Sequence, residues 1–156
     1  MSPKSKVQKS KVGLLLLFVA CLTAGCLKFG DDKEFLSPNV TVQHLQRVNS
    51  LTGVQFPPGT TGLAYLYLGS GIDDSLAIKV AIPPEKREDL LRNEVFVKGR
   101  QEAPHLQIGR AKPWWKLDAL KHSTHRKLEL PQGRFLECSL GEEDGKLVLY
   151  LSWIST

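Results

Sequence analysis

One alternating stretch, SLAIKVAI at residues 75–82, constrains the fold more than any other part of the chain. Apolar branched residues occupy every second position, and Ser, Ala, Lys and Ala occupy the positions between them, which is the two-residue period of a β-strand with one buried face. Residues 63–68 (LAYLYL) are also rich in β-forming side chains, and the intervening GSGIDD is a turn sequence. The segment therefore predicts an antiparallel hairpin with one face covered.

The C-terminal third contains three further stretches with the same period. Residues 127–130 (KLEL), 134–140 (RFLECSL) and 146–154 (KLVLYLSWI) each place apolar side chains at alternate positions, which predicts strands. The last two are separated by GEEDG at 141–145, which ends in the Asp-Gly pair typical of a tight hairpin turn.

Two other stretches predict helices. Ser37-Pro38 supply a cap and a first helical residue, apolar residues follow at a spacing of three from residue 42 to residue 51, and Gly53 is a stop signal. Residues 40–42 (VTV) fit the start of a strand equally well. A shorter helix is predicted over residues 83–93, which open with Pro-Pro-Glu. The expected fold is α+β, one small antiparallel sheet of four to five strands with two or three helices packed mainly on one face.

Residues 98–127 show no steady period, and eight Lys and Arg side chains face two acidic ones there, so we expect a long loop with at most one short helix. Trp114-Trp115 lie in this loop between Lys112 and Lys116. An exposed tryptophan flanked by lysines fits anionic lipid headgroups, a sugar ring or a partner's pocket, so these four residues are the candidate binding surface. The alternative, favoured by the usual packing of large aromatic side chains, is that both rings cap the edge of the core.

The first 26 residues have the layout of an export signal. Four lysines precede residue 12, an apolar run extends from Val12 to Cys21, and the sequence LTAGC follows at residues 22–26. Small residues ending in a cysteine resemble the lipobox of bacterial lipoproteins, although Thr23 stands where the family usually has Leu, Val or Ile. The resemblance implies that Cys26 receives a diacylglycerol and becomes the N-terminus.

This resemblance implies a lipoprotein signal peptide at 1–25, a lipid-anchored tether at 26–38 and a single α+β domain at 39–156. It also implies attachment to a membrane of the bacterial cell envelope. The periplasmic side of the outer membrane is favoured, because Leu27 rather than Asp follows the cysteine. Lipidation at Cys21, an ordinary signal peptide and an uncleaved anchor are the alternatives. The uncharged run of 16 residues from Val12 is shorter than the ~20 that a bilayer span needs.

Charge and cysteine content narrow the function classes. The chain has 21 basic and 16 acidic residues, and four of the basic ones but none of the acidic ones precede residue 26, which leaves 17 against 16. The apparent basicity belongs to the export signal, so we predict no nucleic-acid partner. Of Cys21, Cys26 and Cys138, only the last would remain as a free thiol, so no disulfide framework is expected.

Three histidines are weak candidates for metal binding. His122 and His125 would share one face of a helix, and His105 lies in the same loop. The neighbouring Lys and Arg side chains disfavour a bound cation, so we predict surface histidines and no metal.

Neither a nucleophile nor a carboxylate pair is clearly indicated. Cys138 alternates with Leu136 and Leu140, which predicts a buried and unreactive thiol rather than a nucleophile. The pair Asp73-Asp74 is explained by turn chemistry. We therefore predict no catalytic residue and no cofactor.

A second, more diffuse resemblance covers residues 50–153. The hairpin with an Asp-Asp turn, the Pro-Pro helix, Lys-Pro-Trp-Trp and a closing Val-Leu-Tyr-Leu strand are similar to small uncharacterised exported bacterial proteins, which implies one domain and no particular activity. We expect an envelope lipoprotein that acts as a non-catalytic binding or structural module towards anionic lipid, a cell-wall polymer or an envelope protein. A small hydrolase, a metal-dependent envelope enzyme and an inhibitor or immunity-type lipoprotein are the alternatives.

Overall fold

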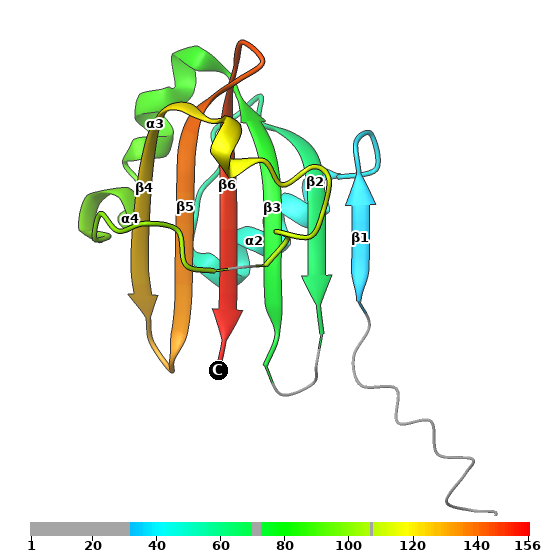
Figure 1. Cartoon of the computed structure of the whole chain (residues 1–156), viewed down its shortest axis with the longest axis vertical. Coiled ribbons are helices and arrows are strands. Elements are labelled where there is room, and N and C mark those ends of the chain that lie inside the picture. Colours follow the sequence, from blue (N-terminus) through cyan, green and yellow to red (C-terminus); the bar gives the residue numbers. More distant parts are fainter. Residues whose placement is uncertain (1–31, 70–72, 107) are drawn as a thin grey trace, which may run out of the picture.

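The fold is known from a computed structural model that describes residues 32–69, 73–106 and 108–156. Within these ranges the chain forms one six-stranded sheet in which every neighbouring pair is antiparallel, in the order β1-β2-β3-β6-β5-β4 (Figure 1). The strands are β1 (Lys33–Leu36), β2 (Thr61–Leu68), β3 (Ser75–Ile82), β4 (Lys121–Leu130), β5 (Arg134–Glu143) and β6 (Lys146–Ser155). The helices are α2 (Val42–Thr52), α3 (Arg87–Leu91) and α4 (Glu94–Lys98), with single 3₁₀ turns η1 (Pro84–Lys86) and η2 (Leu117–Ala119).

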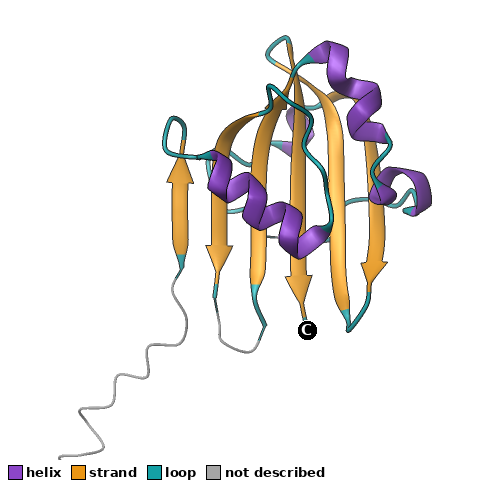
Figure 2. Cartoon of the chain, turned by 180° about the vertical axis from the view of Figure 1, so that it is seen from behind, coloured by secondary structure: helices purple, strands orange, loops and turns teal. Residues whose placement is uncertain are grey.

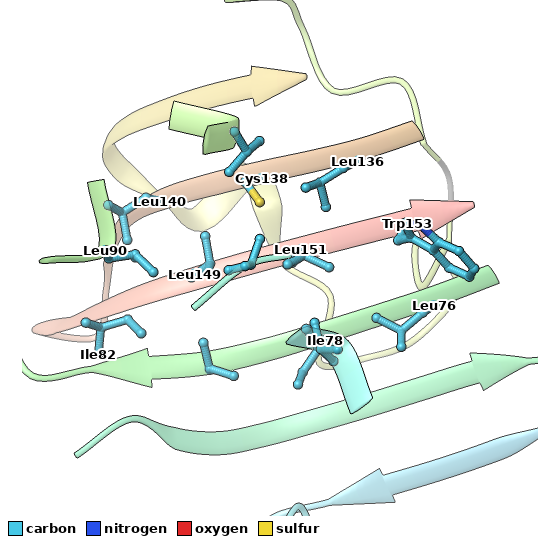
Figure 3. Packing of buried hydrophobic residues seen from close by; sticks show 14 of the residues in the cluster. Leu76, Ile78, Ile82, Leu90, Leu136, Cys138, Leu140, Leu149, Leu151 and Trp153 are labelled. Atoms are coloured by element: carbon cyan, nitrogen blue, oxygen red, sulfur yellow. The ribbon is translucent and has the colours of Figure 1, made fainter. Parts of the chain in front are cut away.

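The main core lies between the sheet and the three α-helices, which all pack on one of its faces (Figures 1 and 2). The alternation in β3 that the sequence shows brings Leu76, Ile78 and Val80 into this core at 0% exposure. Each fully buried side chain of this size contributes roughly 1.5–3 kcal/mol. Figure 3 shows how the core side chains of β3, β5 and β6 meet Leu90 of α3 and one another.

The last strand, β6, joins the two halves of the sheet. It pairs with β3 of the first hairpin, where Ile78 lies opposite Leu151, and with β5, where Cys138 lies opposite the same leucine. The β5–β6 turn has the predicted Asp-Gly geometry, with φ of 51° at Asp144 and 73° at Gly145. Both residues have the positive φ that a tight turn between twisted strands requires.

The predicted α+β fold with one antiparallel sheet is confirmed, but the predicted number of four to five strands is wrong. The additional strand is β1, which lies within residues 26–38, where a tether was expected. It has only four residues and is held by β2, with Lys33 opposite Tyr67 and Leu36 opposite Ala64. A strand this short at the edge of a sheet is formed by its partner and has too few residues to show a period of its own.

The helix predicted from Ser37-Pro38 begins later in the chain. Its N-cap is Thr41, whose backbone N–H donates to Nδ1 of His44 at 3.0 Å, and its first residue is Val42. The predicted stop at Gly53 is confirmed, because this glycine has φ of 77° and its N–H donates to the carbonyl of Asn49.

The helix predicted over residues 83–93 is also shorter than expected, since it consists of η1 and α3 and ends at Leu91. A further helix, α4, follows it after the buried side chain of Asn93. That amide accepts from the backbone N–H of Gln55 at 2.6 Å and donates to its carbonyl at 3.0 Å. Asn93 thus ties the helical segment to the chain that leaves α2.

The expected signal peptide at 1–25, the lipidation site Cys26 and its alternative Cys21 lie outside the described residues, as does part of the predicted turn between β2 and β3. Among the residues that are described, no helix has the length and apolar character needed to span a bilayer.

Candidate functional site

The sheet face that the helices leave uncovered is crossed by the loop of residues 99–120, which runs from α4 to β4 (Figure 1). This face is lined by side chains that alternate with those of the core, and several are polar yet buried: Ser75, Glu137, Ser139, Glu143 and Ser152 are each 3–7% exposed. We call these residues, with Lys79, His125 and Tyr150, the buried polar layer. Both faces of the sheet are therefore covered, one by helices and one by the loop.

An ion pair lies at one side of the buried polar layer. Nζ of Lys79 is 2.9 Å from Oε1 of Glu143, and the hydroxyl of Tyr150 donates to Oε2 of the same carboxylate at 2.6 Å. The ammonium group also lies 5.1 Å from the centroid of the Tyr150 ring. The side chains of Lys79 and Glu143 are only 12% and 7% exposed, so the pair is shielded from water.

The local environment shifts the pKa values of this group in opposite directions. Burial alone would raise the pKa of Glu143, but hydrogen bonds from Tyr150 and Lys79 and the charge of Lys79 together hold that pKa below its usual range. Burial and the adjacent carboxylate raise the pKa of Tyr150 far above its usual range. At neutral pH Glu143 is therefore a carboxylate and Tyr150 a neutral phenol.

Trp115 packs directly on this group. Its ring meets that of Tyr150 edge to face, with centroids 5.0 Å apart and an interplanar angle of 81°, and that of Trp114 at 5.5 Å and 72°. Gly109 lies against the same indole, because a Cβ at this glycine would come within 2.9 Å of a ring carbon. Trp115 is thus wedged between the sheet and its own loop.

Two more residues of the predicted basic tryptophan surface, Trp114 and Lys112, contact other parts of the protein. Glu34 of β1 accepts from Nε1 of Trp114 at 3.0 Å and from Nζ of Lys112 at 2.6 Å. Both tryptophans are half-buried, and Lys116 alone of the four residues is an exposed side chain. The two rings therefore lie on the loop side of the sheet and not in the main core whose edge they were expected to cap, and Lys112 is paired with Glu34.

A surface cleft of about 360 Å³ opens within the loop beside Trp115. Arg110 and Asp118 are exposed at this cleft, and Leu106 and Leu117 are half-buried. Trp115 is the one candidate residue from the sequence that lines this cleft. The residues that line the cleft are Pro104, Leu106, Arg110, Trp115, Leu117 and Asp118.

A second polar group in the buried layer holds the first part of the loop. Oε2 of Glu137 accepts from the backbone N–H groups of His105 and Leu106 at 3.0 and 2.9 Å.

His125 lies beside Glu137, with Nδ1 2.6 Å from the hydroxyl of Ser139 and Nε2 4.0 Å from Oε2 of Glu137. Nε2 of His125 and Oε1 of Glu137 are buried and have no hydrogen-bond partner among the described residues. This arrangement contains a hydroxyl, an imidazole and a carboxylate, but Ser139 is 5% exposed and does not line the cleft, so its hydroxyl is not placed to attack a substrate there.

The environment of His125 predicts a pH dependence of stability. Burial lowers the pKa of His125; nearby Glu137 opposes this shift, and His105 and Arg126 reinforce it. The folded state therefore binds a proton more weakly than the unfolded chain, whose histidines titrate near ~6.5. We expect the free energy of unfolding to fall as the pH falls below ~6.5, and to level off below the pKa in the folded state.

Urea unfolding between pH 8 and pH 5 tests this expectation. His125→Asn, which keeps a polar atom near Ser139, should flatten the pH dependence over this range. His122→Gln changes an exposed histidine on the same strand and should retain the slope of the unchanged protein. Equal slopes in His125→Asn and the unchanged protein would contradict the assignment to His125.

The three histidines considered as metal ligands are not brought together. The sequence predicts His122 and His125 on one face of a helix, but both belong to strand β4, in which a one-residue bulge separates Lys121 from Thr124. His105 and His122 are exposed, as expected for surface histidines, whereas His125 is half-buried. His122 borders a cleft with Pro84 and Arg87 beside the helices, whereas His125 faces Ser139 on the loop side. Within residues 32–69, 73–106 and 108–156, no three His, Cys, Asp or Glu side chains are grouped so that they could hold a metal ion.

The two remaining candidate residues, Cys138 and Asp74, make contacts that stabilise the fold. The thiol of Cys138 is 0% exposed within the core, and burial raises its pKa far above the usual range, as expected for an unreactive cysteine. Asp74 accepts from the hydroxyl of Tyr67, and its carbonyl accepts from the N–H of Ser155. It therefore ties the turn end of the β2–β3 hairpin together and joins it to β6.

The chain was compared with models of known protein families, with curated proteins and with solved structures, and none of the three comparisons finds a match.

Proposed function

We propose that this protein is a lipid-anchored module of the bacterial cell envelope that binds a ligand in the cleft beside Trp115 and performs no catalysis. The observation that carries the proposal is the order of features along the chain. A lysine-rich start, an apolar run and Ala-Gly-Cys at residues 24–26 are followed almost immediately by strand β1. An export signal of this type places the following domain outside the cytoplasm.

The short chain between Cys26 and strand β1 limits how far the domain can lie from its anchor. Seven Cα–Cα steps separate Cys26 from Lys33, so the start of β1 lies within ~25 Å of the anchored residue even if the chain is fully extended. Lys33 lies at the same end of the sheet as the C-terminal end of β6 (Figure 1). Tyr150, on which Trp115 packs, lies midway along β6, so anchoring at that end leaves the flank with the cleft open.

Features of the loop side favour binding over catalysis. The cleft has a volume in the range of small-molecule sites, and its lining includes both apolar and charged side chains. The nucleophilic groups considered, the thiol of Cys138 and the hydroxyl of Ser139, are at most 5% exposed. A binding role is therefore supported better than a hydrolytic one.

Intact mass and membrane partition of the expressed chain test the proposal. We expect a polypeptide that begins at Cys26, carries the mass of a diacylglycerol, and sediments with membranes. Cys26→Ala should remain unprocessed, whereas Cys21→Ala should behave like the unchanged chain. Recovery of an unmodified chain that begins at Met1, or processing that depends on Cys21, would contradict the assignment of Cys26.

A further inference from the structure

Three clefts lie in a row along the end of the sheet at which β2 and β6 begin. The first, of about 310 Å³, lies between α2 and residues 55–60. The second, of about 350 Å³, crosses the ends of β2, β3 and β6, and the third, of about 310 Å³, continues past β5 to the start of β4. Gly59 lines the first and second clefts, and Pro84, Gly145 and Leu147 line the second and third. Because neighbouring clefts share lining residues, they form one continuous surface, which we call the end groove.

Turns that are held within the protein support the end groove. A Cβ at Gly59 would come within 2.9 Å of a ring carbon of Pro83, so two turns are in contact where the first cleft meets the second. The N–H and the hydroxyl of Thr60 donate to the carbonyl of Pro57 at 3.2 and 2.7 Å, and the N–H of Lys86 donates to the carbonyl of Pro83 at 2.8 Å. A surface fixed in this way loses little conformational freedom on binding, which favours affinity.

The first cleft is the apolar part of the end groove. Val42, which is 65% exposed, lines it together with the half-buried side chains of Leu45 and Phe56. The exposed residues Gln46 and Gln55 add amide groups, and no charged side chain is among the described residues that line this cleft. Apolar walls suit an aliphatic or aromatic side chain of a ligand, and amide groups can both donate to and accept from a peptide main chain.

The length of the end groove suits an extended chain. From β2 to β4 it crosses four spacings between neighbouring strands, each of ~4.8 Å, which gives ~19 Å. An extended polypeptide advances ~3.3 Å per residue, so ~6 residues span this distance. Successive clefts along such a path can accept alternate side chains of a bound peptide, which is how grooves of this kind select a sequence.

The anchored end of the chain is too short to fill the end groove. Lys33 lies opposite Tyr67, six residues further along β2 than Thr61, which lines the groove. Six residues of strand correspond to ~20 Å, and the chain from Cys26 to Lys33 reaches ~25 Å at most. If this chain ran back along the sheet, only ~5 Å would remain to occupy a groove of ~19 Å.

The position of the anchor also excludes the membrane and a second copy of the chain as occupants. Figure 1 shows the β5–β6 turn, which borders the end groove, and the C-terminus at opposite ends of the sheet, and the anchored chain enters at the end with the C-terminus. Copies anchored in one membrane stand in the same orientation, so their end grooves all face away from that membrane and cannot cover one another. The occupant that remains is a polypeptide that approaches from the side away from the membrane.

We infer that the end groove binds an extended segment of a partner polypeptide, ~6 residues long, with an aliphatic or aromatic side chain in the cleft that Val42 lines. The inference rests on the proposed function, because anchoring at Cys26 turns this end of the sheet away from the membrane. It goes beyond that function by assigning a second surface, since none of the residues that line the end groove lines the cleft beside Trp115.

Selection from a phage library of random 12-residue peptides supplies the probe. The processed full-length protein, in mild detergent, is immobilised through a C-terminal tag, which leaves the opposite end of the sheet accessible. We expect enriched peptides that share an apolar residue. Each synthetic peptide, labelled with fluorescein, should bind saturably with a dissociation constant of ~100 μM or lower.

Two valine substitutions form a matched pair for this binding assay. Val42→Glu places a carboxylate in the apolar cleft and should weaken binding about tenfold or more, as expected for a central contact. It also places an acidic residue in the first turn of α2, where the helix dipole favours it, so the fold should be retained. Val97→Glu makes the same change at a valine that is 68% exposed outside the groove, and the affinity should stay within about twofold.

Amide chemical shifts of the ¹⁵N-labelled protein locate the bound peptide. The signals of Gly59 and Gly145, which line the groove, should move on titration, whereas that of Gly109, which lies against Trp115, should not. Three results would overturn the inference: no peptide enriched above a selection on the tag alone, equal affinity of Val42→Glu and the unchanged protein, and shifts at Gly109 in place of those at Gly59 and Gly145. The mass and membrane partition of the same preparation report on the lipid anchor without any peptide, so failure of this inference is distinguishable from failure of the proposed function.

Discussion

Replacing Glu143 by Ala is expected to lower the free energy of unfolding by about 3–5 kcal/mol, the usual cost of removing one partner from a buried ion pair. The side chain of Lys79, which is 12% exposed in the folded protein, would lose its carboxylate partner. The hydroxyl of Tyr150 would lose its 2.6 Å acceptor at the same time. Urea unfolding at pH 7, followed by tryptophan fluorescence, measures the change.

A matched double variant separates the cost of an orphaned charge from the value of the pair. Lys79→Met combined with Glu143→Leu removes both charges and keeps the volume, so its stability should lie within about 1 kcal/mol of the unchanged protein or exceed it. A loss in Glu143→Ala below about 0.5 kcal/mol, the range of ordinary surface substitutions, would show that water reaches the ion pair.

The same pair predicts an acid dependence. The pKa of Glu143 is lowered in the folded state, so its contribution is complete above the ordinary glutamate value of ~4.3. That contribution is lost as the pH falls through the lower value of the folded protein. This window lies below the one expected for His125, so the two groups can be distinguished in one pH series.

The buried polar layer explains both the success and the limit of sequence-based prediction here. The alternation of β3 correctly identifies the core face, and Leu76 and Ile78 lie there. The polar side chains between them look like the solvent-exposed face of a two-sided sheet, yet Ser75 is 7% exposed and Lys79 is half-buried. Because burial of this face depends on a loop without periodicity, no local pattern in the strands reveals it.

Two segments that become strands by pairing with a neighbouring strand were also missed. Strand β1 depends on pairing with β2, and the first half of β4 depends on β5, so residues 121–126 lay in the predicted loop. A strand at the edge of a sheet has one partner only, and its own composition is therefore a weaker guide than that of a central strand.

The candidate site was predicted only in part. Two adjacent tryptophans in a basic loop drew attention to residues 112–116, and Trp115 does line the cleft. The ion pair of Lys112 could not be predicted from the sequence, because its partner, Glu34, lies 78 positions away in the chain. Arg110 and Asp118 had no distinguishing sequence context, since their proximity arises from the path of the folded loop.

Replacing Glu137 by Ala is expected to release the first part of the loop from the sheet and to cost about 3 kcal/mol. The carboxylate accepts two backbone hydrogen bonds, from His105 and Leu106, and bonds to a charged acceptor contribute ~1.5–3 kcal/mol each. Burial of this residue, at 3% exposure, means that water cannot readily replace the lost acceptor. Hydrogen exchange of the two amides should accelerate much more than exchange in the central strands β3 and β6.

Two further substitutions test whether Glu137, and not another acidic residue of this region, holds the loop. Glu137→Gln keeps one acceptor oxygen without the charge, so its exchange rates at His105 and Leu106 should lie between those of Glu137→Ala and the unchanged protein. Glu102→Ala removes an acidic side chain from the same loop. Its ion pairs with Arg100 and Lys127, at 3.2 and 3.9 Å, are partly exposed, so this substitution should lower the free energy of unfolding by at most about 1 kcal/mol. If Glu102→Ala accelerates exchange at Leu106 as much as Glu137→Ala does, surface ion pairs rather than the buried carboxylate hold the wall of the cleft. If only Glu137→Ala does so, the wall on which a ligand would rest is fixed from inside the sheet.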